Sequence, residues 1–563
     1  MNKYCRQIIL VVLALLPFAA VAGNSVSGLG SMRLVPTFHC CSVYATYSGD
    51  DNTNSVCAVR YRVSGQSAWH NALACWDDNA NKQYKGSIVY LQPSTTYDVA
   101  IDLSDSDGVS GTTSITNTVT TWNETPQVGS DAGWNSNISS SQTISTGGSG
   151  VSGMRQYGPS GTSRISFSVS SSTSRCLVVN ADNVLIQNID FSGGQNNCIK
   201  VTGGYTNIWI RNCTFSNWGW PIQSTGDGTI PDQFDDAAIT FGDGSANGSY
   251  RCVVESCTVN PPQGGANSWS NGGHPCGPHG IFFSLMRGEC VCRYNRVYGS
   301  SGHYYNDGIG GYQNESVNGA ASNDSDIYGN IVSEVWDDAI ESDGGNRNVR
   351  IFGNTLTNVH TGISTAANNV GPSYVFRNFG ANNNYAGVTW LKRGISSGGS
   401  NNGRQYVLFN TVESPNIWQN VIDNSGGGSV YEARCFNNLF HNVSGYSAIK
   451  DPTASWTSQY DYDMLYPGCG NGTLPSGSES HMLNGTPSYV NGYYLASSST
   501  GYHAGKAIAN IGDDASGNPI SNPNVGAYDE RFPALLLGPQ PLANGTTSPP
   551  SPPGNLHVVS AGP

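Results

Sequence analysis

The stretch NVLIQNIDF at positions 183–191 returns 24 residues later as NIWIRNCTF at positions 207–215. Both segments begin with Asn, carry two apolar residues separated by one variable residue, and then have a second Asn before a closing Phe. The frame recurs with Asn330, Asn354 and Asn378, again in steps of 24 residues. A fixed period of this length is typical of a solenoid, in which each coil buries its apolar side against its neighbours.

Copies of the frame at positions 252–259, 290–297, 406–412 and 433–440 extend the repeat, with loop insertions between some of them. Asparagine tolerates the left-handed backbone conformation, and its amide can bond to the Asn of the next coil. We therefore expect an interior ladder at the recurring asparagines, which are Asn295, Asn330, Asn354, Asn378, Asn410 and Asn437. A Greek-key sandwich would explain the strands but not the returning period.

The composition agrees with an all-β fold. Of 563 residues, 70 are Gly and only 12% are charged, against about 25% charged residues in an ordinary globular chain. Gly, Ser, Thr and Asn favour turns and strands over helix interiors, which argues against a helical bundle. The formal net charge of −13 argues against a nucleic-acid partner, because phosphate binding requires clusters of Lys and Arg.

The repeat resembles the right-handed parallel β-helix of pectate lyases, polygalacturonases and related carbohydrate-active proteins. Segments at 460–463, 487–490, 493–495 and 525–529 resemble the closing segment of many secreted β-helix proteins. Polygalacturonases carry N-T-D, D-D, G-H-G and R-I-K in that order, whereas here His279 precedes Asp337 and Asp338 and no R-I-K follows them. The resemblance therefore implies the fold and a carbohydrate substrate, and it transfers no catalytic residues.

The N-terminus has the pattern of a signal peptide. Lys3 and Arg6 precede an apolar run at 8–20, and an A-x-A cleavage site ends at Ala22. We expect segment 1–22 to direct secretion, to the periplasm or outside the cell. No second apolar run reaches the length of about 18 residues that would indicate a membrane span. Removal of Cys5 leaves 14 of the 15 cysteines, an even number that favours disulfides over a zinc site.

Two further segments flank the repeat. Residues 30–122 carry short alternating strands, and LQPSTTYDV at 91–99 resembles the tyrosine-corner signature of fibronectin type III domains. In that family the Tyr hydrogen-bonds back to an upstream loop, which predicts the same for Tyr97. The β-helix is expected over 140–535, and the Pro-rich segment 545–563 is a tail or a truncated module.

Ionisable residues recur at one position of the second strand in each coil. When these strands are aligned on their central Ile, the residues two positions before that Ile are Ala237, His279, Asp307, Asp338 and Thr361. Adjacent coils lie about 4.8 Å apart, so His279, Asp307 and Asp338 are expected to line up on one face. Glu341 lies three positions after Asp338, so strict alternation puts it on the opposite face unless a turn or bulge intervenes.

Paired carboxyl groups of this kind suit glycosidic-bond hydrolysis. A separation of about 5 Å, one coil, is that of nucleophile and acid in retaining glycosidases, and like-charge repulsion makes one carboxyl a general acid near neutral pH. We predict a secreted glycoside hydrolase in which Asp338 and Asp307 are the reacting pair, His279 tunes them and Glu341 is a further candidate. The expected substrate is an extracellular polysaccharide, bound by a monomer.

Aromatic, acidic and basic residues near these positions are candidate substrate contacts. They are Trp336, Tyr305, Tyr312, Asp337, Trp390, Lys392 and Arg393. Tyr304 offers another ring, and Asp235, Asp236 and Asp343 add further acids to the same region.

Other interpretations stay open. The acids can be turn residues, or Asp337 and Asp338 can bind a structural Ca²⁺. A Ca²⁺-dependent lyase or epimerase acting on uronate polymers would need a base, for which Lys392, Arg393 and Lys450 are the candidates. A non-catalytic glycan-binding or adhesin-type surface protein would need neither a base nor Ca²⁺. Hydrolysis itself requires no cofactor.

Overall fold

The computed structural model describes residues 23–231, 235–242, 244, 247–381, 389–393, 403–414, 420–423, 432–442, 448–451, 457–466 and 474–541. The expected signal peptide at 1–22 and the Pro-rich segment at 545–563 lie outside these residues. The described chain is built from strands, with one short 3-10 helix, η1 (Asn79–Asn81). None of its helices is long and apolar enough to cross a membrane.

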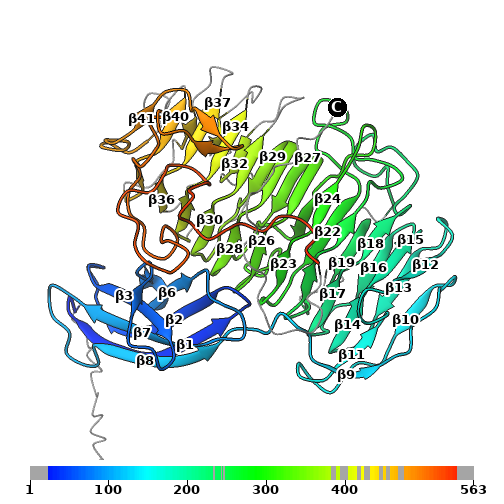
Figure 1. The fold of residues 1–563 in the computed structure, drawn as a ribbon, viewed down its shortest axis with the longest axis horizontal. Coiled ribbons are helices and arrows are strands. Elements are labelled where there is room, and N and C mark those ends of the chain that lie inside the picture. Colours follow the sequence, from blue (N-terminus) through cyan, green and yellow to red (C-terminus); the bar gives the residue numbers. More distant parts are fainter. Residues whose placement is uncertain are drawn as a thin grey trace, which may run out of the picture.

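A small β-sandwich precedes the repeat and packs two four-stranded antiparallel sheets around one apolar core (Figure 1). The first sheet has the order β1 (Val26–Pro36), β2 (Cys41–Gly49), β6 (Gln83–Ile88), β5 (Trp76–Asp78). The second has the order β4 (His70–Asn71), β3 (Val56–Val63), β7 (Thr96–Ser104), β8 (Ser114–Thr120). The backbone N–H of Gln92 donates a 2.8 Å hydrogen bond to the hydroxyl of Tyr97, which confirms the predicted tyrosine corner.

The rest of the described chain forms a right-handed parallel β-helix, as the 24-residue period predicts. One wall is a 12-stranded parallel sheet. In chain order its strands are β9 (Val128–Asp131), β11 (Met154–Tyr157), β14 (Val184–Gln187), β17 (Ile208–Arg211), β20 (Val253–Glu255), β23 (Val291–Arg293), β26 (Asp326–Tyr328), β28 (Val349–Phe352), β30 (Ser373–Phe376), β33 (Gln405–Leu408), β36 (Ala433–Phe436) and β39 (Gln459–Asp461).

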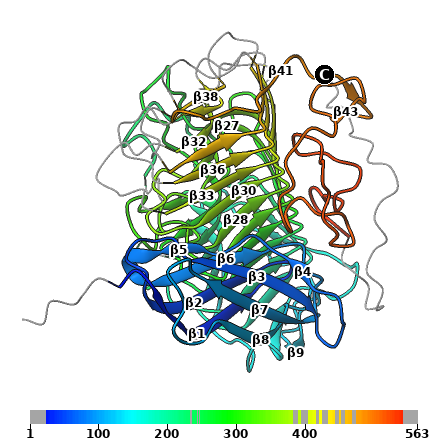
Figure 2. The same cartoon turned by 90° about the vertical axis from the view of Figure 1, so that its left-hand side faces the viewer.

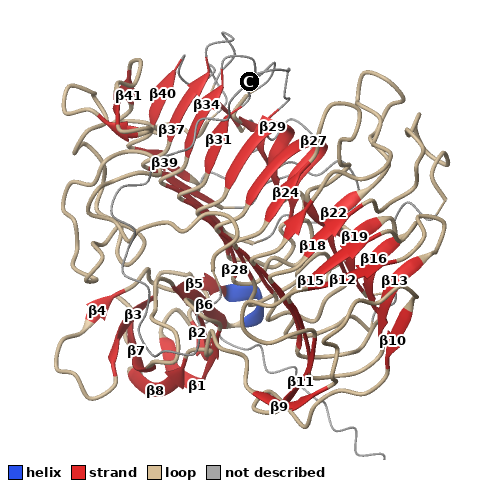
Figure 3. Cartoon of the chain, turned by 45° about the vertical axis from the view of Figure 1, so that its right-hand side comes forward, coloured by secondary structure: helices blue, strands red, loops and turns tan. Residues whose placement is uncertain are grey.

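The remaining walls belong to a 21-stranded parallel sheet that bends within each coil (Figure 3). Its strands are β10 (Gln142–Ile144), β12 (Ile165–Ser168), β13 (Arg175–Val179), β15 (Ile189–Ser192), β16 (Asn197–Val201), β18 (Thr214–Ser216), β19 (Ala237–Phe241), β21 (Thr258–Val259), β22 (His279–Ser284), β24 (Arg296–Tyr298), β25 (Ile309–Tyr312), β27 (Ile331–Glu341), β29 (Thr355–Ser364), β31 (Phe379–Ala381), β32 (Thr389–Lys392), β34 (Thr411–Ser414), β35 (Ile422–Asp423), β37 (Leu439–Asn442), β38 (Ile449–Lys450), β40 (Met464–Tyr466) and β41 (Leu483–Asn484). Apolar residues from all walls fill one continuous interior. A two-stranded antiparallel sheet, β42 (Tyr489–Val490) and β43 (Tyr494–Leu495), follows the last coil.

An asparagine ladder runs through the corner between the two walls. The Asn295 amide donates to Oδ1 of Asn330 at 3.0 Å, and Asn330 donates to Asn354 at 3.0 Å. The chain of bonds continues through Asn378, Asn410 and Asn438 and ends on the carboxylate of Asp463. These side chains are buried, so each amide satisfies backbone and side-chain partners that water does not reach.

The ladder differs from the prediction at one coil. Asn437, the expected member, has the left-handed conformation with φ of 60°, and Asn438 occupies the ladder. In the coils from Asn295 onward the left-handed residue is the one just before the ladder Asn, as Gly353 is before Asn354. That turn directs the following side chain inward, which is why the second Asn of the pair is the interior one.

The sandwich and the C-terminal segment both lie against the 12-stranded sheet (Figure 2). Phe38 and Tyr90 of the sandwich pack on Trp209 and Phe352 of the sheet. Arg350 and Asp326 of the sheet form a fully buried ion pair at 2.6 Å. Arg350 also donates a 2.6 Å hydrogen bond to the hydroxyl of Ser42, which belongs to the sandwich.

The C-terminal segment runs back along the stack. The backbone N–H of Gly526 bonds to the carbonyl of Asn437, and that of Gly538 bonds to the carbonyl of Gly329, nearer the first coils. Figure 1 shows this segment crossing the sheet. It thereby connects late coils to central ones.

The thirteen cysteines within the described residues are all buried free thiols. Cys252 and Cys290 lie on adjacent coils, joined through the backbone bond from Val291 to the Cys252 carbonyl. No disulfide joins any two of these thirteen cysteines, so the structure does not support the predicted disulfides among the residues that it describes.

Candidate active site

A corner in each coil positions the acidic residues. In β27, Ala339 and Ile340 are consecutive and both point into the core. The residues on either side of this pair, Asp338 and Glu341, therefore project from the same outer face although they are three positions apart. Oxygen atoms of Asp338, Glu341 and Asp343 lie within 4.8 Å of one another. The expectation from strict alternation, that Glu341 faces away, is wrong because the strand bends here.

The predicted stack of side chains is present along the coils. Backbone pairing sets Ala237 beside His279 and Asp338 beside Thr361. Between them the central residues Ile281, Ile309 and Ile340 pair in succession, which brings Asp307 into line.

Asp307 is held between its two neighbours in the stack. His279 Nδ1 lies 3.0 Å from Asp307 Oδ2, and the backbone N–H of Asp338 donates to Asp307 Oδ1 at 3.1 Å. Side chains of both His279 and Asp307 are almost fully buried. The hydrogen bond from Asp338 thus orients the Asp307 carboxylate, and His279 lies against its other oxygen.

Lys392 supplies positive charge to the acids. Its Nζ lies 3.4 Å from Oδ2 of Asp338, and Lys392 occupies the same ladder position as Glu341, with Ser364 between them. Burial opposes the charge of this ammonium, but Asp338, Asp343 and the other acids raise the pKa of Lys392 well above its ordinary value. Lys392 is therefore a cation at neutral pH.

Asn314 connects the outer acids. Its amide donates to Glu341 Oε1 at 3.0 Å and to Asp343 Oδ2 at 3.3 Å. Asp343 also accepts bonds from the Ser364 hydroxyl, 2.7 Å, and the Ala366 backbone N–H, 2.6 Å. Glu341 is only partly buried, whereas Asp338 and Asp343 are buried.

Burial and mutual repulsion raise the pKa values of four acids. The pKa of Glu341 rises well above its ordinary value, first through burial and then through the charge of Asp307. Burial and Asp338 do the same to the pKa of Asp337. Burial raises the pKa of Asp343 to about 7 and also raises that of Asp338, in each case against the charge of Lys392. Protonated carboxyl groups are therefore available near neutral pH.

These side chains surround an open cavity of about 310 Å³. Its lining includes His279, Asp307, Asp337, Glu341, Asp343 and Lys392, together with Gly311 of β25 and residues 313–315 that follow this strand. Asp338 is fully buried and does not line the cavity. We therefore correct the predicted reacting pair: Asp338 lies beneath the cavity and touches Asp307 and Lys392, whereas Glu341 reaches the cavity.

Three predicted substrate contacts point into the protein. Tyr305 is fully buried and its hydroxyl bonds to the carbonyl of Asn260. Trp390 packs in the core, where its indole fills the space left by glycines at 362 and 380. Arg393 is buried and pairs with Asp451 at 2.7 Å. All three side chains are buried and none lines the cavity, so these three expectations are wrong.

The other candidates have mixed outcomes. Trp336 is half-buried and packs on Tyr304, with ring centroids 4.6 Å apart, outside the cavity lining. The backbone of Tyr312 pairs with Ser284, and its side chain lies outside what the structure describes. Lys450 stands in strand register with Asp423, farther along the ladder of Lys392.

Two of the additional acids belong to other environments. Asp235 forms ion pairs with Arg175 and Lys200. Asp236 is buried, which raises the pKa of its carboxyl well above the ordinary value, with Asp235 adding to the effect. Neither lines the cavity described above.

Sequence inspection missed His274, which lines the cavity, and Trp269, which packs against it. Trp269 and His274 belong to the loop between β21 and β22, and His274 Nε2 lies 3.4 Å from Asp337 Oδ2. The Trp269 ring stacks on His360, with centroids 5.5 Å apart. In the sequence, the one signal for these residues is a Trp within a Gly- and Ser-rich segment. The repeat pattern itself gives no information about inserted loops.

The acids also have the donor chemistry of a calcium site. Oxygens of Asp307, Asp337 and Asp338 lie within 4.8 Å of one another, and carboxylate oxygens are the ligands that Ca²⁺ prefers. Lys392 already provides a positive charge at Asp338, where such an ion would compete with it. Calcium stays a prediction.

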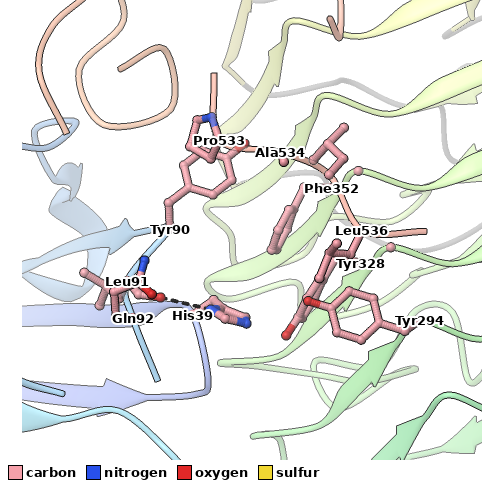
Figure 4. A pocket seen from close by; sticks show the side chains of 13 residues that line it. His39, Tyr90, Leu91, Gln92, Tyr294, Tyr328, Phe352, Pro533, Ala534 and Leu536 are labelled. Atoms are coloured by element: carbon pink, nitrogen blue, oxygen red, sulfur yellow. Dashed lines mark hydrogen bonds between the residues drawn. The ribbon is translucent and has the colours of Figure 1, made fainter. Parts of the chain in front are cut away.

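A second cavity, of about 180 Å³, lies at the other wall, between the sandwich, the 12-stranded sheet and the C-terminal segment (Figure 4). Tyr90, Tyr328 and Phe352 give it an aromatic lining, and Pro533 closes one side. No Asp, Glu, Lys or Arg is among its described lining residues. Of these two cavities, the first is therefore the one lined by groups that could take part in acid–base chemistry.

Comparison of the chain with protein-family models, with curated proteins and with solved structures gives no match.

Proposed function

We propose that the protein is a secreted glycoside hydrolase that cleaves a polysaccharide at the acidic cavity. One observation supports this more than any other: Asp307 and Glu341 come from adjacent coils, both line the cavity, and the charge of Asp307 helps to raise the pKa of Glu341. A held carboxylate beside a protonated one is the arrangement that two-carboxylate glycosidases use.

The roles follow from the contacts. Glu341 donates its proton to the glycosidic oxygen as the bond from that oxygen to the anomeric carbon breaks. Asp307, oriented by His279 and by the N–H of Asp338, attacks the anomeric carbon or removes a proton from the incoming water. Lys392 and Asp338 set the charge beneath them.

A polysaccharide lyase is the second candidate, because Lys392 projects into the cavity and β-helix lyases employ a basic residue as the proton acceptor. A lyase base must be uncharged before it removes a proton. The neighbouring acids raise the pKa of Lys392 well above its ordinary value, so its ammonium cannot accept one at neutral pH. Hydrolysis is therefore better supported.

The sandwich is proposed to be a fibronectin type III-like support. Its aromatic residues and Ser42 pack on the wall opposite the acids, which leaves the cavity open. Such a placement suits a domain that braces the β-helix and takes no part in the chemistry.

The test is a reducing-end assay over a polysaccharide panel with wild type, Glu341→Gln and Asp307→Asn. We expect each variant to lose about 10²–10⁴-fold in kcat. Glu334→Gln is the matched control, since Glu334 is also on β27 but outside the cavity lining. Products that absorb in the ultraviolet as unsaturated uronates would instead establish the lyase. Glycan binding without cleavage would support the binding-protein interpretation.

A further inference from the structure

An exposed indole lies beside the acids. Trp269 has 42% of its surface exposed, although it touches His274 and His360. Its indole also counteracts in part the rise in the pKa of Asp337, which lines the cavity. The ring therefore lies next to His274, which lines the same cavity as the proposed reacting groups.

The loop that carries Trp269 is anchored from within. Asn267, only 2% exposed, accepts a bond from the backbone N–H of Cys276 at 2.9 Å and from the Ser224 hydroxyl at 3.1 Å. Its amide reaches the carbonyls of Gly273 and His274. The two ends of the 267–276 loop are thus fixed on one buried amide, and the indole does not depend on a ligand for its position.

His360 supports one side of the indole. The two rings are stacked at an interplanar angle of 21°. Burial and the charge of Lys392 lower the pKa of His360 to about 3, so the imidazole is neutral at any ordinary pH. A neutral ring can remain against the indole, and the exposed remainder of Trp269 is available to a ligand.

The charge around the cavity selects among polysaccharides. Five acids, at 307, 337, 338, 341 and 343, surround one lysine, and the whole chain carries −13. Lys392, the one Lys or Arg among the described lining residues, already pairs with Asp338, so the carboxylates of a uronate polymer would find no free Lys or Arg in the cavity. A neutral sugar needs no such partner, and the C–H face of its ring packs well on an indole.

We infer that Trp269 is a stacking platform for one pyranose ring of a neutral polysaccharide, which extends from the acidic cavity onto the 267–276 loop. This inference rests on the proposed function and specifies its substrate class. The indole binds the ring next to the bond that is cleaved and contributes to affinity, whereas the acids perform the chemistry.

The experiment measures binding of neutral oligosaccharides by calorimetry in a Glu341→Gln background, and KM and kcat in the active chain. We expect Trp269→Ala to weaken binding and raise KM about tenfold, and Trp269→Phe to retain most of the affinity. Trp69→Ala is the matched control, since Trp69 is a partly exposed Trp of the sandwich, held between Arg60 and Arg62. Unfolding temperatures of the variants establish that each is folded.

The outcomes separate the platform from the hydrolase. If the wild type cleaves a neutral glycan and Trp269→Ala keeps its KM, the platform is wrong and the hydrolase stands. If a neutral glycan binds, is not cleaved, and dissociates more readily from Trp269→Ala, the platform stands and the hydrolase is wrong. Tighter binding of a polyuronate than of any neutral glycan would overturn the assignment of substrate class.

Discussion

The backbone N–H of Asp338 donates a 3.1 Å hydrogen bond to Oδ1 of Asp307, one coil earlier. The bond ties the orientation of an acid that lines the cavity to the main chain of the next coil, independently of the Asp338 side chain. Asp338 itself is fully buried and pairs with Lys392.

Exchanging each of these acids for its amide should therefore have unequal effects. Asp338→Asn keeps the backbone donor, and we expect a loss of activity of no more than about tenfold. Asp307→Asn removes a group proposed to react, with a loss of about 10²–10⁴-fold. Steady-state kinetics on the same glycan compare the two. Equal losses would mean that Asp338 takes part in the chemistry directly.

The acidic cluster makes stability depend on pH. Asp343 has its pKa raised to about 7, so the folded chain binds a proton there that the unfolded chain releases above about pH 4. Stability must then fall as the pH rises from about 4 to 7. We expect Asp343→Asn, which keeps an acceptor for Ser364, to show a smaller fall. Unfolding temperatures from pH 4 to 8 measure it, and parallel curves for the two proteins would contradict the assignment.

The asparagine ladder should be sensitive to a single truncation. Asn354 donates to Asn378 and to the Ile327 carbonyl and accepts from Asn330. Asn354→Ala leaves several buried groups without partners, and we expect a loss of about 3 kcal/mol or more of unfolding free energy. Urea denaturation is the measurement. Asn318→Ala, at an exposed position, should change stability by less than about 0.5 kcal/mol.

Removal of one member of the buried ion pair should weaken domain docking. Arg350→Met leaves the Asp326 carboxylate without its cation and removes the bond to Ser42, so we expect a loss of about 3–5 kcal/mol. Limited proteolysis of the 121–127 connection would report undocking of the sandwich. A variant as resistant and as stable as wild type would show that apolar packing alone holds the two domains together.

The repeat itself was predictable, because the interior positions of a solenoid recur at a fixed step and are occupied by similar residues in the sequence. The finer placement was not. The shift of the ladder from Asn437 to Asn438 depends on a left-handed turn, and the outward position of Glu341 depends on a bend at Ala339 and Ile340. Neither the left-handed turn nor the bend can be recognised from a pattern of alternating residues.

Aromatic residues were misjudged for a related reason. Tyr305 and Trp390 look like sugar contacts in the sequence, but both pack in the core, Tyr305 against Trp218 and Trp390 in the space left by two glycines. Trp269, by contrast, lies in an insertion and reaches His360 more than ninety positions later. Only the folded chain shows that the two meet.

The returning C-terminal segment changes how the stack comes apart. A plain solenoid frays from its ends, because each coil touches only its neighbours. Here the segment that follows the last coil contacts Asn437, Arg377 and Gly329 in turn, and the sandwich covers Phe352 in the middle. Slow amide exchange should therefore peak in the central coils, whose other wall carries the acidic cavity. The coils that carry the acidic cavity are thereby the last to open, because the sandwich and the returning segment together hold this part of the stack.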